Sequence, residues 1–342
     1  MNITEFDYYL PENLIAQTPN ELRDKCKLLI YDKTNNQIIH CIFKDIINYL
    51  TEADVLVLNN SKVMPARLLF NNGNNKLEIL LIRKISGGVY DCMVRPGRKF
   101  KNNTELKINQ NLKCKIKDYS EIGRIIEFYN DSGKLVDDNV IFSYGDIPLP
   151  PYITDYKGDK TYYQTVYSKI NGSTAAPTAG LHFTEGLLQK IKSKICDIIE
   201  ITLHIGPGTF QPLKCENIFE HKMHSEYYSI NQEDYCKICN YKKNGKKIIA
   251  VGTTVVRTLE TVFAAAQDLQ APKLSGETKL YISPGFVFRC VDSIITNFHL
   301  PRSSLIIMIS AFISRKKVMD LYNIAVKNNY RFFSFGDAMF IR

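Results

Sequence analysis

The stretch KKIIAVGTTVVRTLETVFAAAQ, residues 246–267, reads as a short buried strand that runs directly into an amphipathic helix. The same alternation of strands and helices continues on both sides of this stretch. We expect helices over 185–195 and 231–243, a strand over 198–206, and a further strand over 277–283. A last strand, polar turn and helix follow, and Ser303 caps that helix. This rhythm predicts an α/β domain whose sheet is mostly parallel, with crossover helices.

The segment from about Pro65 to Gly145 has a different character, with short alternating apolar runs separated by NNGNN, SGG and NDSG. No helical period intervenes, so these runs predict a small all-β barrel. The piece before it is too small to bury a core alone. We therefore expect a discontinuous α/β catalytic domain of residues 1–64 and 150–342, with the barrel of 65–149 inserted.

Composition limits the class of protein. The 342 residues are 45% hydrophobic and 23% charged, which is ordinary for a globular chain long enough for two domains. The net charge of +9 favours a polyanionic partner, but charge does not choose among RNA, DNA and anionic lipid.

We expect a cytoplasmic protein, because the N-terminus lacks an apolar signal region and the longest apolar run, 305–313, is too short to span a bilayer. Nine cysteines without a regular frame fit reduced thiols. Cys236 and Cys239 form a lone CxxC on the helix expected over 231–243, so we expect no metal there.

The stretch NGSTAAPTAGLHFT, residues 171–184, has small residues with Gly and Pro around His182. It is a poor helix and a poor strand, and such backbone is typical of a close approach to a ligand. Thr184 is placed to cap the next helix. For His182 alone, the simpler interpretation is a surface loop whose histidine is solvated or packed.

The junction AVGTTVVRTLE places Thr253 and Thr254 at a helix N-terminus with Arg257 one turn in. Unpaired N–H groups there favour an anion such as a carboxylate or phosphate. Ordinary packing with a threonine cap and a surface arginine is about as good an interpretation.

HIGPGTFQPL brings His204 to a strand end followed by Gly206 and Gly208. A dinucleotide fingerprint needs a third glycine where Gln211 stands, which argues against a Rossmann loop and against the usual methyltransferase. In HKMHSEYYSI, His221 and His224 are three residues apart and Glu226 follows closely, but strand-like alternation follows. Proton transfer by these imidazoles is therefore favoured over zinc binding.

Polar groups at other turns complete the set. His299 and Arg302 lie in ITNFHLPRSSL, and Asp337 lies among aromatic residues in YRFFSFGDAMFIR. These aromatics either stack on RNA bases or form core, and core is favoured. In VRPGRKFK, the basic side chains either contact phosphate or form a solvated surface: Arg98, Lys99 and Lys101.

Nine segments in this order resemble one family, the S-adenosylmethionine:tRNA ribosyltransferase-isomerase of queuosine biosynthesis. They are LPENLIAQTP, LNNSKVMPARL, IPLPPYI, GSTAAPTAGLHFT, ITLHIGPGTFQPL, HKMHSEYY, AVGTTVVRTLE, TNFHLPRSSL and YRFFSFGDAM. Two departures are mild. Cys26-Lys27 stands where the family pattern has Ser-Arg, and Pro207 stands where it has a small residue.

The resemblance implies an enzyme that consumes S-adenosylmethionine as a substrate. It would transfer and isomerise the ribosyl part onto the 7-aminomethyl-7-deazaguanine wobble base of tRNA, giving epoxyqueuosine-tRNA, adenine and methionine. It implies no metal or redox cofactor, and a discontinuous α/β fold with an inserted barrel. We further expect a monomer.

This chemistry requires a base for the acidic ribose carbon, an acid for the leaving adenine and a cradle for the methionine carboxylate. The candidate proton-transfer groups are His182 and His224, followed by His204 and Asp337. The candidate substrate-binding groups are Thr253, Thr254, Arg257, His299, Arg302 and Glu226. Arg98, Lys99 and Lys101 are candidates for tRNA. These turns should converge at one end of a single sheet.

Two other classes remain open from the sequence. One is a non-catalytic tRNA-binding factor, which would bind anticodon stem-loops without consuming S-adenosylmethionine. The other is a tRNA methyltransferase of unusual fold, which would release S-adenosylhomocysteine.

Overall fold

The computed structural model describes residues 1–342 except 122, 155, 207, 209–212, 214 and 266–271. The chain divides into two compact units. The first comprises Met1–Ser61, Pro151–Ile170 and Ala176–Arg342, and the second comprises Lys62–Pro150 and Asn171–Ala175.

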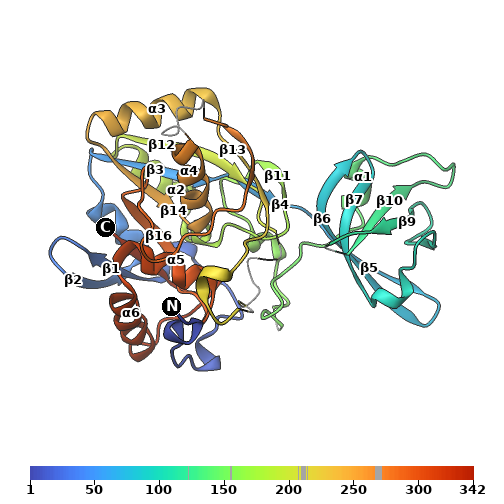
Figure 1. The fold of residues 1–342 in the computed structure, drawn as a ribbon, viewed down its shortest axis with the longest axis horizontal. Helices are drawn as coiled ribbons and strands as arrows, with labels where there is room; N and C mark the ends of the chain where they lie inside the picture. The colour runs from blue at the N-terminus through green and yellow to red at the C-terminus, as the bar shows by residue number, and fades with distance from the viewer. Residues whose placement is uncertain (122, 155, 207, 209–212, 214, 266–271) are drawn as a thin grey trace. The chain divides into compact units, whose positions relative to one another are not determined.

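A nine-stranded sheet is the centre of the first unit (Figure 1), in the order β15-β13-β12-β3-β14-β16-β17-β1-β2. Its strands are β1 (Lys27–Asp32), β2 (Gln37–Ile42), β3 (Asp54–Asn59), β12 (Asp197–Leu203), β13 (Glu226–Ser229), β14 (Lys247–Val251), β15 (Ser275–Thr278), β16 (Ser293–Asn297) and β17 (Ala338–Ile341). The strand expected over 198–206 is confirmed as β12, and β1 and β2 form an antiparallel hairpin.

The sheet is mixed, so the expectation of a mostly parallel sheet was wrong. Among the described strands, β12, β3, β14 and β16 form a parallel block, and β1 is parallel to β17. The other four pairings are antiparallel. β17 runs against β16, and β13 folds back on β12. Strand–helix alternation along the chain did not reveal either reversal.

The described residues of the first unit form five α-helices: α2 (Glu185–Lys192), α3 (Gln232–Lys243), α4 (Thr253–Ala265), α5 (Ser304–Ile313) and α6 (Arg315–Lys327). Thr184, Asn231 and Ser303 cap α2, α3 and α5 through side-chain oxygens, as the sequence predicted for Thr184 and Ser303. The strand expected over 277–283 was misplaced, since β15 runs from Ser275 to Thr278 and shares only residues 277 and 278 with that range.

Short 3₁₀ helices connect these elements: η1 (Ile3–Phe6), η2 (Glu12–Leu14), η3 (Arg23–Lys25), η4 (Phe43–Tyr49), η6 (Lys160–Tyr163), η7 (Thr178–His182) and η9 (Ile218–Glu220). The stretch 171–184 therefore ends in a buried 3₁₀ turn rather than a surface loop. In the core, η4, η7 and α2 pack against β1, β3 and β14 through residues such as Phe43, Phe183 and Leu56.

The second unit is a barrel-like, nearly closed antiparallel sheet in the order β5-β6-β7-β10-β9-β8. Its elements are β5 (Arg67–Asn72), β6 (Asn75–Ser86), β7 (Val89–Arg95), η5 (Gly97–Lys99), β8 (Glu105–Lys107), β9 (Lys113–Tyr119), β10 (Arg124–Tyr129) and α1 (Asp138–Phe142). It has its own apolar core, which includes Ile79, Phe100 and Phe128. A separate ladder pairs β4 (Ser61–Val63) with β11 (Ile170–Ser173).

In the part of the chain that the structure describes, no helix has both the length and the apolar character needed to cross a membrane.

Candidate active site

The parallel block of the first unit ends in a cavity of about 490 Å³. Parallel strands place their carboxyl ends at one edge, where α/β folds bind ligands. The lining comes from the ends of β14 and β16, the starts of α4 and η7, and the segment before β17: Ala176, Pro177, Thr178, Ala179, Ile205, Gly252, Thr253, Thr254, Thr296, Asn297, His299, Leu305, Phe333 and Ser334.

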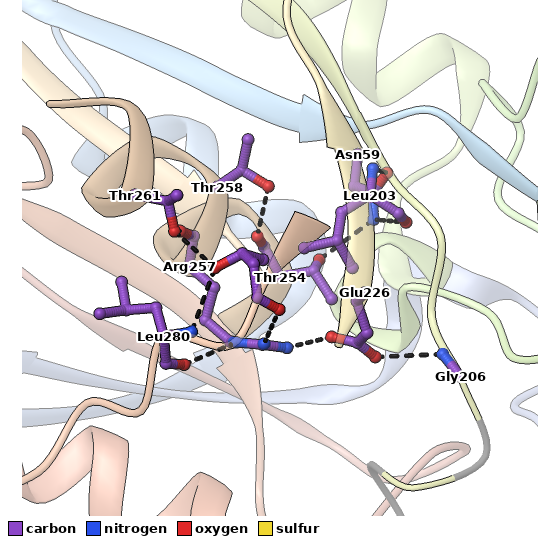
Figure 2. Close-up of polar contacts among 10 residues, drawn as sticks. Asn59, Leu203, Gly206, Glu226, Thr254, Arg257, Thr258, Thr261 and Leu280 are labelled. Carbon is purple, nitrogen blue, oxygen red and sulfur yellow. Dashed lines mark hydrogen bonds and ion pairs between the residues drawn. The ribbon is translucent and has the colours of Figure 1, made fainter. Parts of the chain in front are cut away.

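Asn59, the last residue of β3, links this strand to the end of β12 and to the start of α4 (Figure 2). It is fully buried. Its Nδ2 donates to the Leu203 carbonyl at 3.0 Å and to Thr254 Oγ1 at 3.2 Å, and its Oδ1 accepts from the Leu203 N–H at 3.0 Å. Our sequence analysis missed Asn59, although an amide that ends the apolar run VLVLNN was a usable signal.

The helix α4 begins at Thr253, directly after Gly252, whose φ of +92° lies in the region that favours glycine. Thr253 and Thr254 both line the cavity. The first turn of a helix offers unpaired N–H groups to an anion. The strand-to-helix junction predicted from AVGTTVVRTLE is therefore present beside the cavity.

Arg257, one turn into α4, forms a buried ion pair with Glu226 of β13, each side chain being 4% exposed (Figure 2). The guanidinium also donates to the Leu280 carbonyl at 3.1 Å and to the Thr278 carbonyl at 3.3 Å. Glu226 Oε1 accepts the Gly206 N–H at 3.0 Å. Arg257 is thus not the surface arginine of the simpler interpretation, and Glu226 already balances its charge.

A second cavity of about 340 Å³ lies on the Arg257 side. Glu226, Arg257, Leu280, Tyr281 and Met308 are among its lining residues. It shares Thr253, Thr254 and Leu305 with the first cavity, so the start of α4 separates the two.

His182, at the end of η7, is buried between two polar partners. Its Nδ1 lies 3.1 Å from the Cys26 sulfur, and its Nε2 lies 3.2 Å from Asn297 Nδ2. Burial lowers the pKa of His182 to about 3 and raises that of the Cys26 thiol well above its usual range. His182 lines a third cavity of about 310 Å³ with Arg23 and Cys26, and Ser334 borders both this cavity and the first.

His299 follows β16 and lines the first cavity. It is 5% exposed, and its Nε2 lies 2.9 Å from Thr296 Oγ1. Burial lowers the pKa of His299 to about 3, so the ring is neutral at pH 7.

His204 and His224 lie elsewhere in the first unit. His204 Nδ1 is 2.8 Å from Ser61 Oγ, and its ring stacks on Tyr227 at 5.6 Å. Burial lowers the pKa of His204 to about 4. His224 is exposed, and its ring lies so close to Gly208 that a Cβ there would come within 2.2 Å of it. Pro207 and Gln211, which the sequence analysis considered, lie outside the described residues.

The remaining predicted residues do not line these three cavities. Both Asp337 oxygens accept backbone N–H groups, from Lys27 and Arg331, each at 2.7 Å. Arg302 forms a half-exposed ion pair with Asp7. Arg98, Lys99 and Lys101 are exposed in the second unit, on or beside η5.

Cys236 and Cys239 lie on α3 with free thiols. Among the residues that the structure describes, no group of three or more His, Cys, Asp or Glu side chains is placed to hold a metal ion.

The structure therefore brings together part of the predicted set. Thr253, Thr254 and His299 share one cavity, Glu226 and Arg257 border the next, and His182 is linked to the first through Asn297. A fold of this kind, with cavities at the carboxyl ends of the central parallel strands, is typical of α/β enzymes.

Comparison with known proteins identifies the family. A family profile described as "Queuosine biosynthesis protein" matches residues 3–341. Proteins named S-adenosylmethionine:tRNA ribosyltransferase-isomerase are 46% identical in Halothermothrix orenii and 48% identical in Thermosipho africanus and Acetivibrio thermocellus, each over 100% of both chains. A crystal structure of S-adenosylmethionine tRNA ribosyltransferase from Thermotoga maritima is 39% identical, covers 99% of this chain and 100% of its own, and has a TM-score of 0.56.

The chain belongs to the S-adenosylmethionine:tRNA ribosyltransferase-isomerase family of queuosine biosynthesis, and it is an enzyme of the transferase class. The resemblance drawn from the nine sequence segments is confirmed.

Proposed function

We propose that this enzyme transfers and isomerises the ribosyl moiety of S-adenosylmethionine onto the 7-aminomethyl-7-deazaguanine wobble base of tRNA. The products are epoxyqueuosine-tRNA, adenine and methionine. The observation that carries this proposal is the match over the full length of relatives that bear this activity in their names. S-adenosylmethionine is a substrate here, and the reaction uses no cofactor.

The test is to incubate the protein with S-adenosylmethionine and tRNA carrying the aminomethyl base, and to identify the small products. Adenine plus methionine supports the proposal. S-adenosylhomocysteine would indicate a methyltransferase, and tRNA binding without consumption of S-adenosylmethionine would indicate a binding factor.

The methionine carboxylate is proposed to bind at the start of α4, where Thr253 and Thr254 border two cavities. Arg257 adds positive charge to this end of the helix, but its ion pair with Glu226 makes it a positioning residue for the wall. Arg302, paired with Asp7 outside the cavities, is the weakest of the proposed substrate contacts.

His182, His224, His204 and Asp337 remain the proposed proton-transfer groups. The exposed ring of His224 is open to a substrate, whereas His182 and Asp337 have their polar atoms engaged by protein groups. His182→Ala should abolish adenine release and leave tRNA affinity nearly unchanged. Unchanged turnover would remove His182 from the set.

The second unit is proposed to be an inserted barrel domain that contacts tRNA phosphates through Arg98, Lys99 and Lys101. Each phosphate contact contributes to the salt dependence of binding. The triple alanine variant should bind tRNA more weakly, with a shallower dependence of log Kd on log salt. Lys76→Ala, at an exposed lysine of the same unit, is the matched control. We also propose that the enzyme works as a monomer in the cytoplasm, where it meets tRNA.

A further inference from the structure

Asn297, the last residue of β16, lines the first cavity and holds an unused hydrogen-bond acceptor. The residue is 3% exposed, and among the described residues its Oδ1 has no hydrogen-bond partner. A buried acceptor left unpaired is unfavourable, because it has lost its hydrogen bonds to water. The sequence analysis passed over Asn297 between Thr296 and Phe298, although a polar residue at a strand end next to His299 was a signal.

The orientation of the Asn297 amide follows from its neighbours. Its nitrogen lies 3.0 Å from the Phe333 carbonyl, which can only accept, so the NH₂ group faces that carbonyl. The same NH₂ group donates its second proton to His182 Nε2 at 3.2 Å. His182 therefore carries its proton on Nδ1, directed at the Cys26 sulfur. It has no proton on Nε2 to donate to Asn297 Oδ1.

His299 supplies the complementary donor. Thr296 Oγ1 is buried. Among the described residues, His299 Nε2 is its side-chain hydrogen-bond partner. The heavy-atom contact allows either direction, and we assign the donor role to the hydroxyl. Donation from Thr296 to Nε2 leaves the His299 proton on Nδ1. The N–H donor and the amide acceptor thus belong to residues two positions apart that both line one cavity.

We propose that Asn297 and His299 recognise the amino-bearing edge of the adenine of S-adenosylmethionine. Asn297 Oδ1 accepts from the exocyclic amino group, and His299 Nδ1 donates to the adjacent ring nitrogen. Ala176, Ala179, Leu305 and Phe333 supply apolar contacts for the faces of the ring. This inference rests on the proposed function, and it assigns the base-recognition subsite within it.

Adenine fits this position better than the wobble base. Both bases present a donor beside an acceptor, but the wobble base remains joined to the tRNA backbone. Adenine is the free end of a small molecule, so it can reach a side chain that is 3% exposed at the cavity wall.

The experiment compares S-adenosylmethionine with S-inosylmethionine, in which a carbonyl oxygen replaces the amino group. In the wild type this oxygen would face Asn297 Oδ1, so we expect kcat/KM to favour the adenine substrate by about 100-fold. In Asn297→Ala and Asn297→Ser the preference should fall to about 10-fold or less. Two variants are used so that one poorly folded protein does not decide the outcome.

The ratio of the two kcat/KM values distinguishes loss of base recognition from loss of structure. A structural defect lowers kcat/KM for both substrates alike and leaves their ratio unchanged. Thr258→Val is the matched control: Thr258 is buried in α4, away from the lining of the first cavity, so this variant should keep the wild-type preference. An unchanged preference in both Asn297 variants overturns the inference. A preference that is unchanged while KM for tRNA rises also overturns it and assigns the pair to the wobble base. If the wild type releases no adenine from S-adenosylmethionine, the proposed function itself fails.

Discussion

The two sides of the first cavity are built on opposite principles. On the α4 side, the charged groups are satisfied within the protein, since Arg257 and Glu226 pair with each other and with backbone groups. On the β16 side, the groups are neutral, and Asn297 Oδ1 has no hydrogen-bond partner in the part of the chain that the structure describes. A paired buried charge fixes shape, whereas an unpaired neutral acceptor is available to a ligand. The contrast separates residues that maintain the shape of the cavity wall from residues that are available to bind the substrate.

The largest effect should come from breaking the charged side. Glu226→Ala leaves the Arg257 guanidinium buried without its counter-charge, and such a change costs about 3–5 kcal/mol of unfolding free energy. Urea unfolding measures it. The double variant Glu226→Ala with Arg257→Met removes the orphaned charge and should recover part of the loss. Equal stability of the wild type and Glu226→Ala would show that the pair does not hold this wall.

The neutral side should respond to pH instead. Burial lowers the pKa of His182 and of His299 to about 3, below the ordinary value of 6.5. The unfolded chain then binds more protons than the folded chain below pH 6.5, so stability is complete above that pH and falls on acidification. Each histidine should cost up to about 2 kcal/mol between pH 6.5 and pH 5.

This dependence can be assigned to a residue. In His299→Gln, the slope of unfolding free energy against pH over this range should be smaller by about 1.4 kcal/mol per pH unit. Urea unfolding at several pH values measures the slope. The same slope in wild type and variant would mean that His299 can be protonated within the folded protein.

A matched pair of threonines sharpens the comparison further. Thr254 and Thr258 lie one turn apart on α4, both buried and both hydrogen-bonded, but Thr254 also lines the cavities. Replacing either by valine should cost about 1 kcal/mol of stability. We expect KM for S-adenosylmethionine to rise several-fold in Thr254→Val and to stay near wild type in Thr258→Val. Equal KM values in both variants would count against carboxylate binding at the start of α4.

The smallest effect is expected at Arg302. Its ion pair with Asp7 is half exposed, and exposed pairs contribute less than about 1 kcal/mol. Arg302→Ala should therefore change unfolding free energy little. A large loss of turnover, measured as adenine release, would return Arg302 to the substrate site.

Local signals in the sequence predicted where helices and strands begin and end better than they predicted which distant segments pair. The caps at Thr184 and Ser303 and the strand-to-helix turn at Gly252 follow from short-range geometry, and all three were predicted correctly. The reversal of β17 against β16 depends on a pairing between distant segments, so periodicity could not reveal it.

The same limit applies to the candidate site. Residue type and position at strand ends were enough to select Thr254, His299 and Arg257. They could not show that Glu226 pairs with Arg257, or that both nitrogens of His182 are engaged. Asn59 and Asn297 were missed because a buried amide acts through contacts made by distant segments.

The position of β3 has a consequence for biosynthesis. This strand lies between β12 and β14, whose residues are translated only after more than a hundred further residues. The second unit, by contrast, is built largely from neighbouring hairpins. Closing long loops delays folding. On the ribosome we therefore expect the hairpin unit to fold while β3 is still waiting for its partners, exposed to the chaperones that guard nascent chains.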